Sequence, residues 1–419
     1  MDDIIKENNS INLSNNFLSK PSNKKFDVVI IGGLGHVGLP LGIVLAKVGL
    51  KVSLLDKDLK KALMVMNGEL PFVEYGAEPI LKEVLENGNL KVHSNDEVIS
   101  SAKAVIICLG TPIDEFLNPK TREFLNLIKN FKSYLSEDQL IIIRSTVYPN
   151  TCEQIYRTLG EDKKWKLAYC PERIVQGYAV KELFELPQIV SGMTQEAQDE
   201  AAELFSKLSP KVIITPLKEA ELIKLFSNAW RYIQFAVTNQ FYMISKRFDV
   251  DYDHLRISMT EGYGRLANLP RAGFAAGPCL LKDTMQLASF DYSNFQIGHA
   301  AMRINEGLPN FLVEELKKVH GDLHKKKIGI LGMAFKADID DIRDSLSYKL
   351  GKILRFNGAD VSYTDEFAKN PDFITKEELV NKCEIIIVGV PHSAYSSLTI
   401  PKNAVVVDLW GILKKSDGN

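Results

Sequence analysis

The chain has 419 residues, more than a single hydrophobic core holds, which predicts two or three domains. Its formal net charge of −2 argues against nucleic acid or an acidic membrane surface as a partner, and no apolar run approaches the roughly 18 residues of a membrane span. Five cysteines without CxxC or other metal-ligand spacing indicate reduced thiols, and the polar N-terminal residues lack the pattern of a signal peptide. We therefore expect a cytoplasmic protein without a metal site.

The first part of the chain changes character at Phe26. Residues 1–24 are polar and aperiodic, which predicts a disordered tail whose apolar pairs at 4–5 and 17–18 are the parts able to dock. The run FDVVIIGG that follows is typical of a strand buried on both faces of a parallel sheet. Since similar runs recur further on, we assign residues 25–210 to an N-terminal Rossmann domain.

A glycine-rich turn follows this first strand. Gly33 permits a tight turn, Gly35 lets backbone approach a pyrophosphate, and Gly38 lets the next helix lie close to the strand. The helix N-terminus then offers its N–H groups to phosphate. The second strand ends in Asp56, which is expected to bind the adenosine ribose and repel a 2′-phosphate, so NAD is favoured over NADP although Lys57 weakens that preference.

Later strands of this domain also end in polar residues. Thr111, Ser145 and Thr146 follow the apolar runs at 104–112 and 140–149, where ligands gather in a parallel sheet, although they can equally be turn and cap residues. The run at 166–172 leads to Glu172 and Arg173. A carboxylate in such a turn can be catalytic, but a single exposed acid usually is not.

A long helix is predicted over residues 216–247, because this stretch has no glycine and no proline after Pro216. It is apolar around much of its circumference, which indicates burial between domains or in a dimer interface. Lys224 and Asn228 lie one turn apart on it. They are either a pair at the rim or a polar pair that faces a ligand. The helix opens a central helical domain, 211–320.

The stretch from Gly273 to Asp283 places Cys279 among small residues, which let another group approach its sulfur. The ammonium of Lys282 favours the nucleophilic thiolate. A helix that begins at Pro278 would bring Cys279, Lys282 and Asp283 to one face. The alternative is a buried cysteine in a turn.

The strand, turn and helix pattern begins again at Lys325, and we assign residues 321–419 to a second Rossmann-like domain. Its turn, GILGMAF, lacks the third glycine, so it should hold a nucleotide by other means. Lys336, Asp338, Asp341 and Arg343 lie in this turn and are available to a ligand. The fold class is thus α/β, with two doubly wound domains joined by a central helical domain.

These motifs together resemble the UDP-glucose/GDP-mannose dehydrogenase family over residues 26–415. The resemblance rests on the NAD turn with His36, the strand ends Thr111-Pro112 and Ser145-Thr146-Val147, Pro171-Glu172-Arg173, the Lys224–Asn228 pair, Gly277 to Asp283, Phe335-Lys336, and Asp341 to Ser345. It implies a cytoplasmic homodimer that uses NAD to supply uronic acids for surface polysaccharide.

The resemblance also implies a four-electron oxidation of a sugar C6 alcohol to a carboxylate. Cys279 would capture the aldehyde as a thiohemiacetal and then carry the thioester, Lys224 and Asn228 would stabilise oxyanions, and Asp283 and Glu172 would do the acid–base work in an order left open. Thr146 is counted as both a catalytic residue and a cofactor contact. The implied cofactor contacts are Gly33, Gly35, His36, Val37, Gly38, Asp56, Thr111, Pro112, Ser145, Thr146 and Lys282. The implied substrate contacts are Glu172, Arg173, Lys224, Asn228, Arg265 from a neighbouring subunit, Gly273, Phe274, Gly277, Phe335, Lys336 and Arg343.

The sequence departs from the family pattern at several positions. Gln176 stands where UDP-glucose members usually have a second glutamate, Pro278 follows Gly277 where Gly-Gly-Ser is common, and Arg144 replaces a glutamate. The motif Pro-Glu-Arg-Ile-x-x-Gly resembles that of members that oxidise UDP-N-acetylmannosamine or UDP-N-acetylglucosamine. We therefore favour these two substrates over UDP-glucose. The other readings are a two-electron β-hydroxyacid dehydrogenase and a nucleotide sensor without activity.

Overall fold

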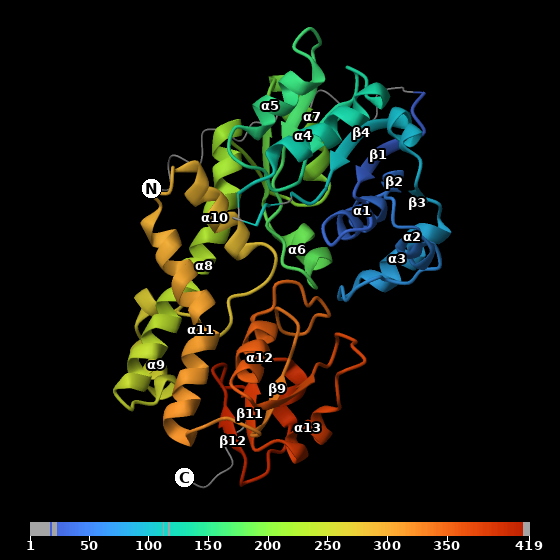
Figure 1. Ribbon diagram of the computed structural model, residues 1–419. Helices are drawn as coiled ribbons and strands as arrows, with labels where there is room; N and C mark the ends of the chain where they lie inside the picture. The colour runs from blue at the N-terminus through green and yellow to red at the C-terminus, as the bar shows by residue number, and fades with distance from the viewer. Residues whose placement is uncertain (1–16, 19–22, 112, 116–117, 414–419) are drawn as a thin grey trace. The chain divides into compact units, whose positions relative to one another are not determined.

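The computed structural model describes residues 17–18, 23–111, 113–115 and 118–413 (Figure 1). The chain divides into two compact units, Met1–Leu225 and Phe226–Asn419. Pro112 and most of the tail at 1–24, including the apolar pair at 4–5, lie outside the described residues. Among the described residues, no helix is both long enough and apolar enough to cross a membrane.

The first unit is built on a sheet that has eight strands within the described residues, in the order β3-β2-β1-β4-β5-β6-β7-β8. All neighbouring strands are parallel except β6 and β7. The strands are β1 Phe26–Ile31, β2 Val52–Leu55, β3 Leu90–His93, β4 Ala102–Ile107, β5 Leu140–Ile143, β6 Lys166–Tyr169, β7 Gln188–Gly192 and β8 Val212–Ile214. The helices are α1 Gly38–Lys47, α2 Leu59–Met66, α3 Ala77–Glu86, α4 Thr121–Phe131, α5 Thr151–Leu159, α6 Ala179–Glu185 and α7 Gln195–Ser206, with 3₁₀ turns at Asp96–Ser101 and Lys132–Tyr134.

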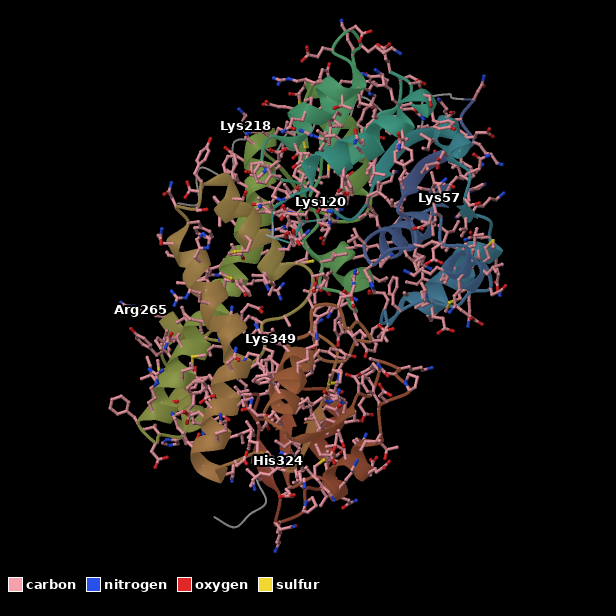
Figure 2. All side chains as sticks on the ribbon, in the orientation of Figure 1. Lys57, Lys120, Lys218, Arg265, His324 and Lys349 are labelled. Carbon is pink, nitrogen blue, oxygen red and sulfur yellow. The ribbon has the colours of Figure 1, made fainter. Side chains whose placement is uncertain are left out.

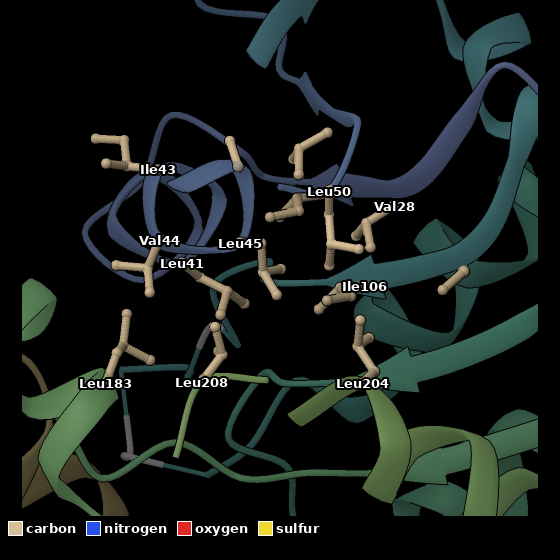
Figure 3. Packing of buried hydrophobic residues seen from close by; sticks show 14 of the residues in the cluster. Val28, Leu41, Ile43, Val44, Leu45, Leu50, Ile106, Leu183, Leu204 and Leu208 are labelled. Carbon is tan, nitrogen blue, oxygen red and sulfur yellow. The ribbon is translucent and has the colours of Figure 1, made fainter. Parts of the chain in front are cut away.

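The core of the first unit lies between this sheet and its helices. Figure 3 shows part of one cluster, in which Leu41 and Leu45 of α1 pack with Ile106 of β4 and with leucines of and near α6 and α7. Strand β5 is buried along its whole length and β4 at every residue except Lys103, as the apolar runs predict for a parallel sheet. Helices therefore cover both faces, and the polar strand ends are left for chemistry.

Phe17 and Leu18 belong to this unit as well. The Phe17 side chain is 5% exposed and packs in the same core cluster. The backbone N–H groups of both residues donate to the carboxylate of Glu203, at 2.7 and 3.2 Å. These two residues are therefore docked rather than disordered, as the sequence allowed for this apolar pair, because an apolar ring and a buried acceptor fix them.

The second unit combines helices with a smaller parallel sheet. Its four strands within the described residues run in the order β10-β9-β11-β12. Helix α11, Gln296–His320, packs along α12, Leu346–Phe356. Between these two helices Lys349 Nζ donates to the backbone oxygen of Glu306 at 2.7 Å (Figure 2). The strands are β9 Lys327–Leu331, β10 Asp360–Thr364, β11 Ile385–Val388 and β12 Val405–Val407. The helices are α9 Tyr252–Thr260, α10 Leu280–Phe290, α11 Gln296–His320, α12 Leu346–Phe356 and α13 Lys376–Lys382, with 3₁₀ turns at Gly264–Leu266 and Ser393–Ser397.

The long helix α8, Leu217–Arg247, runs 31 residues and spans the division between the units. It matches the predicted helix at 216–247 to within one residue. The predicted α/β fold, with two Rossmann-like halves and a helical middle part, is confirmed.

Candidate active site

The glycine turn after β1 has the shape that a dinucleotide needs. A Cβ on Gly33 would lie 2.8 Å from Leu54 Cα, and one on Gly38 would lie 2.3 Å from the Gly32 oxygen, so packing inside the protein requires glycine at both. A Cβ on Gly35 would meet only the Gly32 oxygen, at 3.4 Å. Internal packing leaves Gly35 room for a side chain, whereas a phosphate lying against the backbone would not.

The remaining parts of this turn fit the same ligand. Val37, at the N-cap of α1, has no polar side chain to cap the helix. In the first turn the Leu39 N–H already donates to the Gly35 oxygen, at 3.0 Å, and Pro40 has no N–H, so the Gly38 N–H is the group of this turn that is suited to an anion. Asp56 follows β2, and its carboxylate accepts hydrogen bonds from the N–H groups of Leu34, at 3.0 Å, and Asp58, at 3.1 Å. Lys57 Nζ lies 2.7 Å from Asp96 Oδ1, so an acid offsets the charge that could attract a 2′-phosphate. The His36 ring packs against Phe72.

The other strand ends are only partly explained. Ser145 is buried, and both its N–H and its hydroxyl donate to the Ile107 oxygen, which is the structural role that the cap reading gives it. Thr111 and Thr146 are half-buried at the ends of neighbouring strands. All three residues thus gather at the carboxyl edge of the sheet.

Glu172 and Lys224 form a buried ion pair in the first unit. Lys224 Nζ lies 2.9 Å from Glu172 Oε1, and their side chains are 6% and 11% exposed. Glu172 Oε2 also accepts the Ile174 N–H at 2.9 Å. The rim reading of Lys224 is therefore wrong. The Arg173 guanidinium instead donates to the Pro187 oxygen, and burial lowers its pKa.

A second buried cation, Arg144, was noticed in the sequence only as a departure from the family. It donates to the Cys170 oxygen and to Gln188 Oε1, each at 3.0 Å, and its face covers the Phe205 ring. Burial lowers the Arg144 pKa, and the negative charge of Glu172 opposes that shift. Glu172 therefore faces two cations.

In the second unit Asn228 and Asp283 are joined directly. Asn228 Nδ2 donates to Asp283 Oδ2 at 2.6 Å, and both side chains are buried. Asp283 Oδ1 is also buried, lies 3.4 Å from Lys282 Nζ, and accepts no hydrogen bond within the described part of the chain. A buried carboxylate oxygen in this state is suited to a water or a substrate hydroxyl.

Cys279 differs from the other cysteines, none of which is in a disulfide. It is exposed, whereas burial raises the pKa of Cys108 and Cys170 to about 12 and also raises those of Cys152 and Cys383. The buried-cysteine alternative is therefore wrong for Cys279.

The helix after Cys279 begins at a different residue from the one predicted. Cys279 is the N-cap of α10, which begins at Leu280 rather than at Pro278, and its oxygen accepts the Asp283 N–H at 2.8 Å. Cys279, Lys282 and Asp283 also differ in exposure, because Cys279 is exposed, Lys282 is half-buried and Asp283 is buried. Gly277 has φ of 97°, and a Cβ there would lie 2.5 Å from the Phe335 ring.

Arg343 lies in the loop between β9 and α12, close to this cysteine. Its guanidinium contacts the Asp341 carboxylate at 2.6 to 3.0 Å. That hydrogen bond is the main reason why the Arg343 pKa is raised, and the charge of Cys279 contributes in the same direction. The same loop carries Phe335 and Lys336. Sequence spacing alone did not pair Arg343 with the sulfur.

The remaining predicted substrate residues are distributed as follows. Gly273 and Phe274 are buried in the segment before Cys279. Arg265 is exposed in a 3₁₀ turn beside Tyr263, on the outer surface of this unit (Figure 2). The structure thus unites Cys279, Arg343 and Phe335, and separately Asn228 with Asp283, but does not bring Arg265 to them.

Comparison with known proteins agrees with this geometry. The UDP-glucose/GDP-mannose dehydrogenase family models match three parts of the chain: the NAD binding domain at residues 27–209, the central domain at 218–307 and the UDP binding domain at 329–415. The chain belongs to this family. It is an NAD-dependent nucleotide-sugar dehydrogenase, and the glycine turn and Asp56 are suited to the cofactor.

Two relatives and one solved structure are similar to this chain over nearly its whole length. A UDP-N-acetyl-D-mannosamine dehydrogenase of Methanocaldococcus jannaschii is 29% identical, with 92% of this chain and 93% of that protein covered. A UDP-glucose 6-dehydrogenase of Rickettsia bellii is 27% identical, with 92% and 95% covered. The solved structure of a UDP-D-ManNAc dehydrogenase from Pyrococcus horikoshii has a TM-score of 0.85 at 28% identity and covers 93% of this chain and 96% of that one.

Proposed function

We propose that the chain oxidises the C6 hydroxyl of a UDP-N-acetylhexosamine to a carboxylate. The substrate in this proposal is either UDP-N-acetylmannosamine or UDP-N-acetylglucosamine. One observation carries the proposal: an exposed cysteine caps a helix whose first turn holds a buried carboxylate with an oxygen that accepts no hydrogen bond among the described residues. Relatives named UDP-N-acetyl-D-mannosamine dehydrogenase support the choice of sugar.

The reaction consumes the alcohol, two NAD and one water, and releases the carboxylate, two NADH and three protons. NAD, when bound, accepts a hydride from C6 in each oxidation. Between the oxidations the Cys279 thiolate adds to the aldehyde carbon and forms a C–S bond, which keeps the aldehyde from leaving. Hydride loss leaves a thioester. Addition of water then breaks the C–S bond and returns the thiolate.

Cations and amides in the chain would stabilise the charges that develop. Lys224 and Asn228 lie one turn apart on α8 and offer N–H donors to the oxygen on C6. Arg343 contributes positive charge near the Cys279 sulfur, which favours the thiolate.

Two carboxylates would handle the protons. Asp283 Oδ1 is positioned to accept a proton from water that attacks the thioester, because it is buried and can still accept a hydrogen bond. Glu172 is bound to Lys224 and would act through a water or through that lysine. Lys336 and Arg343 would bind the diphosphate, and the planar Arg343 fork suits it better.

A panel of UDP- and GDP-sugars, followed by NADH formation, tests the substrate class. We expect two NADH per sugar and a C6 carboxylate with UDP-N-acetylhexosamines. Faster turnover of UDP-glucose than of UDP-N-acetylhexosamines would make UDP-glucose the substrate instead. One NADH per substrate would favour β-hydroxyacid chemistry, and NAD and UDP-sugar binding without turnover would favour a sensor.

Replacing Cys279 by serine tests the covalent step. We expect Cys279→Ser to bind NAD with unchanged affinity and to lose carboxylate formation, because a serine hydroxyl at neutral pH is a far weaker nucleophile than a thiolate. Cys383→Ser, which replaces a buried cysteine of the same unit, is the matched control and should oxidise normally. Undiminished acid production by Cys279→Ser would remove the sulfur from the mechanism.

We also propose a homodimer that forms through α8. The helix exposes an apolar stripe of large side chains in the second unit, with Trp230 60% exposed. The stripe consists of Phe226, Trp230, Val237, Phe241 and Ile244. Spacings of four, eleven, fifteen and eighteen residues place these side chains on one face, and a second copy of the same helix would bury that face.

Sedimentation tests the dimer. Trp230→Glu should convert it to a monomer, since a carboxylate would be buried without a partner. Lys218→Glu introduces an acid on the same helix away from the stripe and should leave the dimer intact. A Trp230→Glu protein that sediments as wild type would contradict this interface.

A further inference from the structure

A pair of buried asparagines holds the segment that leads to the candidate nucleophile. Asn239 of α8 and Asn305 of α11 are both 0% exposed. Asn239 Nδ2 donates to the Gly273 oxygen at 3.0 Å, and Asn239 Oδ1 accepts the Gly273 N–H at 2.9 Å. The side-chain amide thus pairs with both backbone groups of one residue, as a neighbouring strand would.

This pairing satisfies a need of the local backbone. Residues 271–279 form neither helix nor strand, and 272–275 are buried. An irregular buried segment must find partners for its N–H and carbonyl groups, and an unpaired buried group costs about 1–3 kcal/mol. Asn239 supplies both partners at Gly273, so it fixes the height and rotation of the segment at that point.

Asn305 determines which way the Asn239 amide faces. Asn305 Nδ2 donates to the Tyr232 oxygen at 3.0 Å, and a carbonyl can only accept, so the Asn305 oxygen is left to face Asn239. Asn239 Nδ2 donates to it at 2.9 Å. The oxygen of Asn239 must then point to the Gly273 N–H, which can only donate. The Tyr232 oxygen at one end and the Gly273 N–H at the other therefore require the same orientation of the two side-chain amides.

The opposite side of the segment is closed by Trp410. A Cβ on Gly273 would lie 2.3 Å from the indole, so the ring lies directly against the glycine. The indole Nε1 donates to the Gly389 oxygen at 3.1 Å, and Arg271 donates to the Trp410 oxygen. Further along, the Gly277 N–H donates to the Asp344 oxygen at 3.3 Å. The segment is fixed at Gly273 and Gly277, two residues before the sulfur.

We propose that Asn239, oriented by Asn305, is a positioning residue that sets the place of the Cys279 sulfur by fixing the segment 271–279. Its effect on turnover rests on the proposed function. Its effect on the sulfur itself does not, because reactivity toward an alkylating reagent needs neither NAD nor a sugar.

The test compares Asn239→Asp with a matched variant of the first unit, Gln139→Glu. Gln139 is also 0% exposed, donates to the Ile99 and Ala102 oxygens at 2.7 Å each, and accepts the Ser136 N–H at 3.0 Å. Each change turns a buried amide that makes two donations and one acceptance into an acid, so a loss of stability is common to both.

The readout is the rate at which iodoacetamide alkylates Cys279, measured by mass spectrometry of that peptide in the full-length protein. We expect the rate in Asn239→Asp to differ from that in Gln139→Glu by about threefold or more, since thiolate reactivity depends on its surroundings. The kcat of Asn239→Asp should fall by a factor of the order of 100, as for a reacting group misplaced by about 1 Å, with NAD affinity unchanged.

Equal alkylation rates in the two variants overturn the proposal, whatever the turnover. If Asn239→Asp does not fold, Asn305→Ser serves instead, because it removes the orienting bond and leaves both Gly273 bonds possible. It should shift the alkylation rate in the same direction by a smaller factor, and a rate equal to that of Gln139→Glu would again refute positioning. If the wild-type protein oxidises no UDP-sugar while Asn239→Asp and Gln139→Glu still differ in alkylation rate, the proposed function is rejected and the positioning role of Asn239 is retained.

Discussion

Substituting Asp365 by asparagine should destabilise the second unit in a way that depends on pH. Asp365 follows β10, and its side chain is 0% exposed. It accepts hydrogen bonds of 2.6 to 3.0 Å from the N–H groups of Met333, Ala334, Phe367 and Ala368 and from His392 Nε2. Burial alone would raise its pKa, but the His392 bond and the backbone donors outweigh burial and lower the pKa from 3.8 to about 2.

The size of the effect follows from this shift. A difference of nearly two pKa units corresponds to about 2 kcal/mol of folding free energy. Because the folded pKa lies below the unfolded one, this stability is fully present above about pH 4 and is lost as the pH falls toward 2. Asparagine also turns an NH₂ group toward N–H donors, which adds to the loss at neutral pH.

Calorimetric melting of the full-length protein between pH 7 and pH 3 provides the measurement. We expect Asp365→Asn to melt roughly 5 °C below wild type at pH 7, for about 2 kcal/mol in a unit of this size, with the gap narrowing below about pH 4. Asp372→Asn alters an exposed acid of the same unit and should show no gap. A gap that stays constant down to pH 3 would refute the assigned role of the charge.

Three further outcomes are expected. Gly38→Ala should weaken NAD binding at least tenfold in a fluorescence titration, because its Cβ would lie 2.3 Å from the Gly32 oxygen, whereas Gly307→Ala meets open space and should bind normally. Asp56→Ser should raise the ratio of NADP to NAD in kcat/KM, since the acid that repels a 2′-phosphate is gone, and an unchanged ratio would count against its ribose role. Phe17→Ala should cost about 3 kcal/mol in urea unfolding while leaving kcat at 25 °C unchanged, and a loss below 1 kcal/mol would mean that the ring does not pack as described.

The elements that sequence predicted well are those with local causes. The glycine turn, Asp56 and α8 follow from spacing and from the absence of breakers, and the structure has them where they were expected. The partner of Lys224 could not be predicted, because Glu172 lies 52 residues away and the bond depends on how α8 meets the end of β6. The same holds for Asn239, although the polar run Thr238-Asn239-Gln240 in an otherwise apolar helical stretch was a signal that could have been noticed.

The start of α10 illustrates a different difficulty. Proline is common at the first helical position, so Pro278 was the natural choice for a helix start. The structure instead uses Gly277, with φ of 97°, to turn the chain and leaves Cys279 at the N-cap. The Phe335 ring, 58 residues later, approaches so closely that only glycine fits at position 277, and no local pattern contains that contact.

The two Rossmann-like halves use the acid after their second strand differently. Both Asp56 and Asp365 accept N–H groups from the turn after the first strand of their own half. Asp56 accepts two hydrogen bonds within the described residues, and a carboxylate has about four acceptor sites, which leaves room for two ribose hydroxyls. Asp365 accepts five donors, one of them from His392, which follows the third strand, and its capacity is filled. The second half therefore has no acceptor site left on this acid for a ribose, which is consistent with the proposal that Lys336 and Arg343, in the loop that Asp365 stabilises, bind the nucleotide instead.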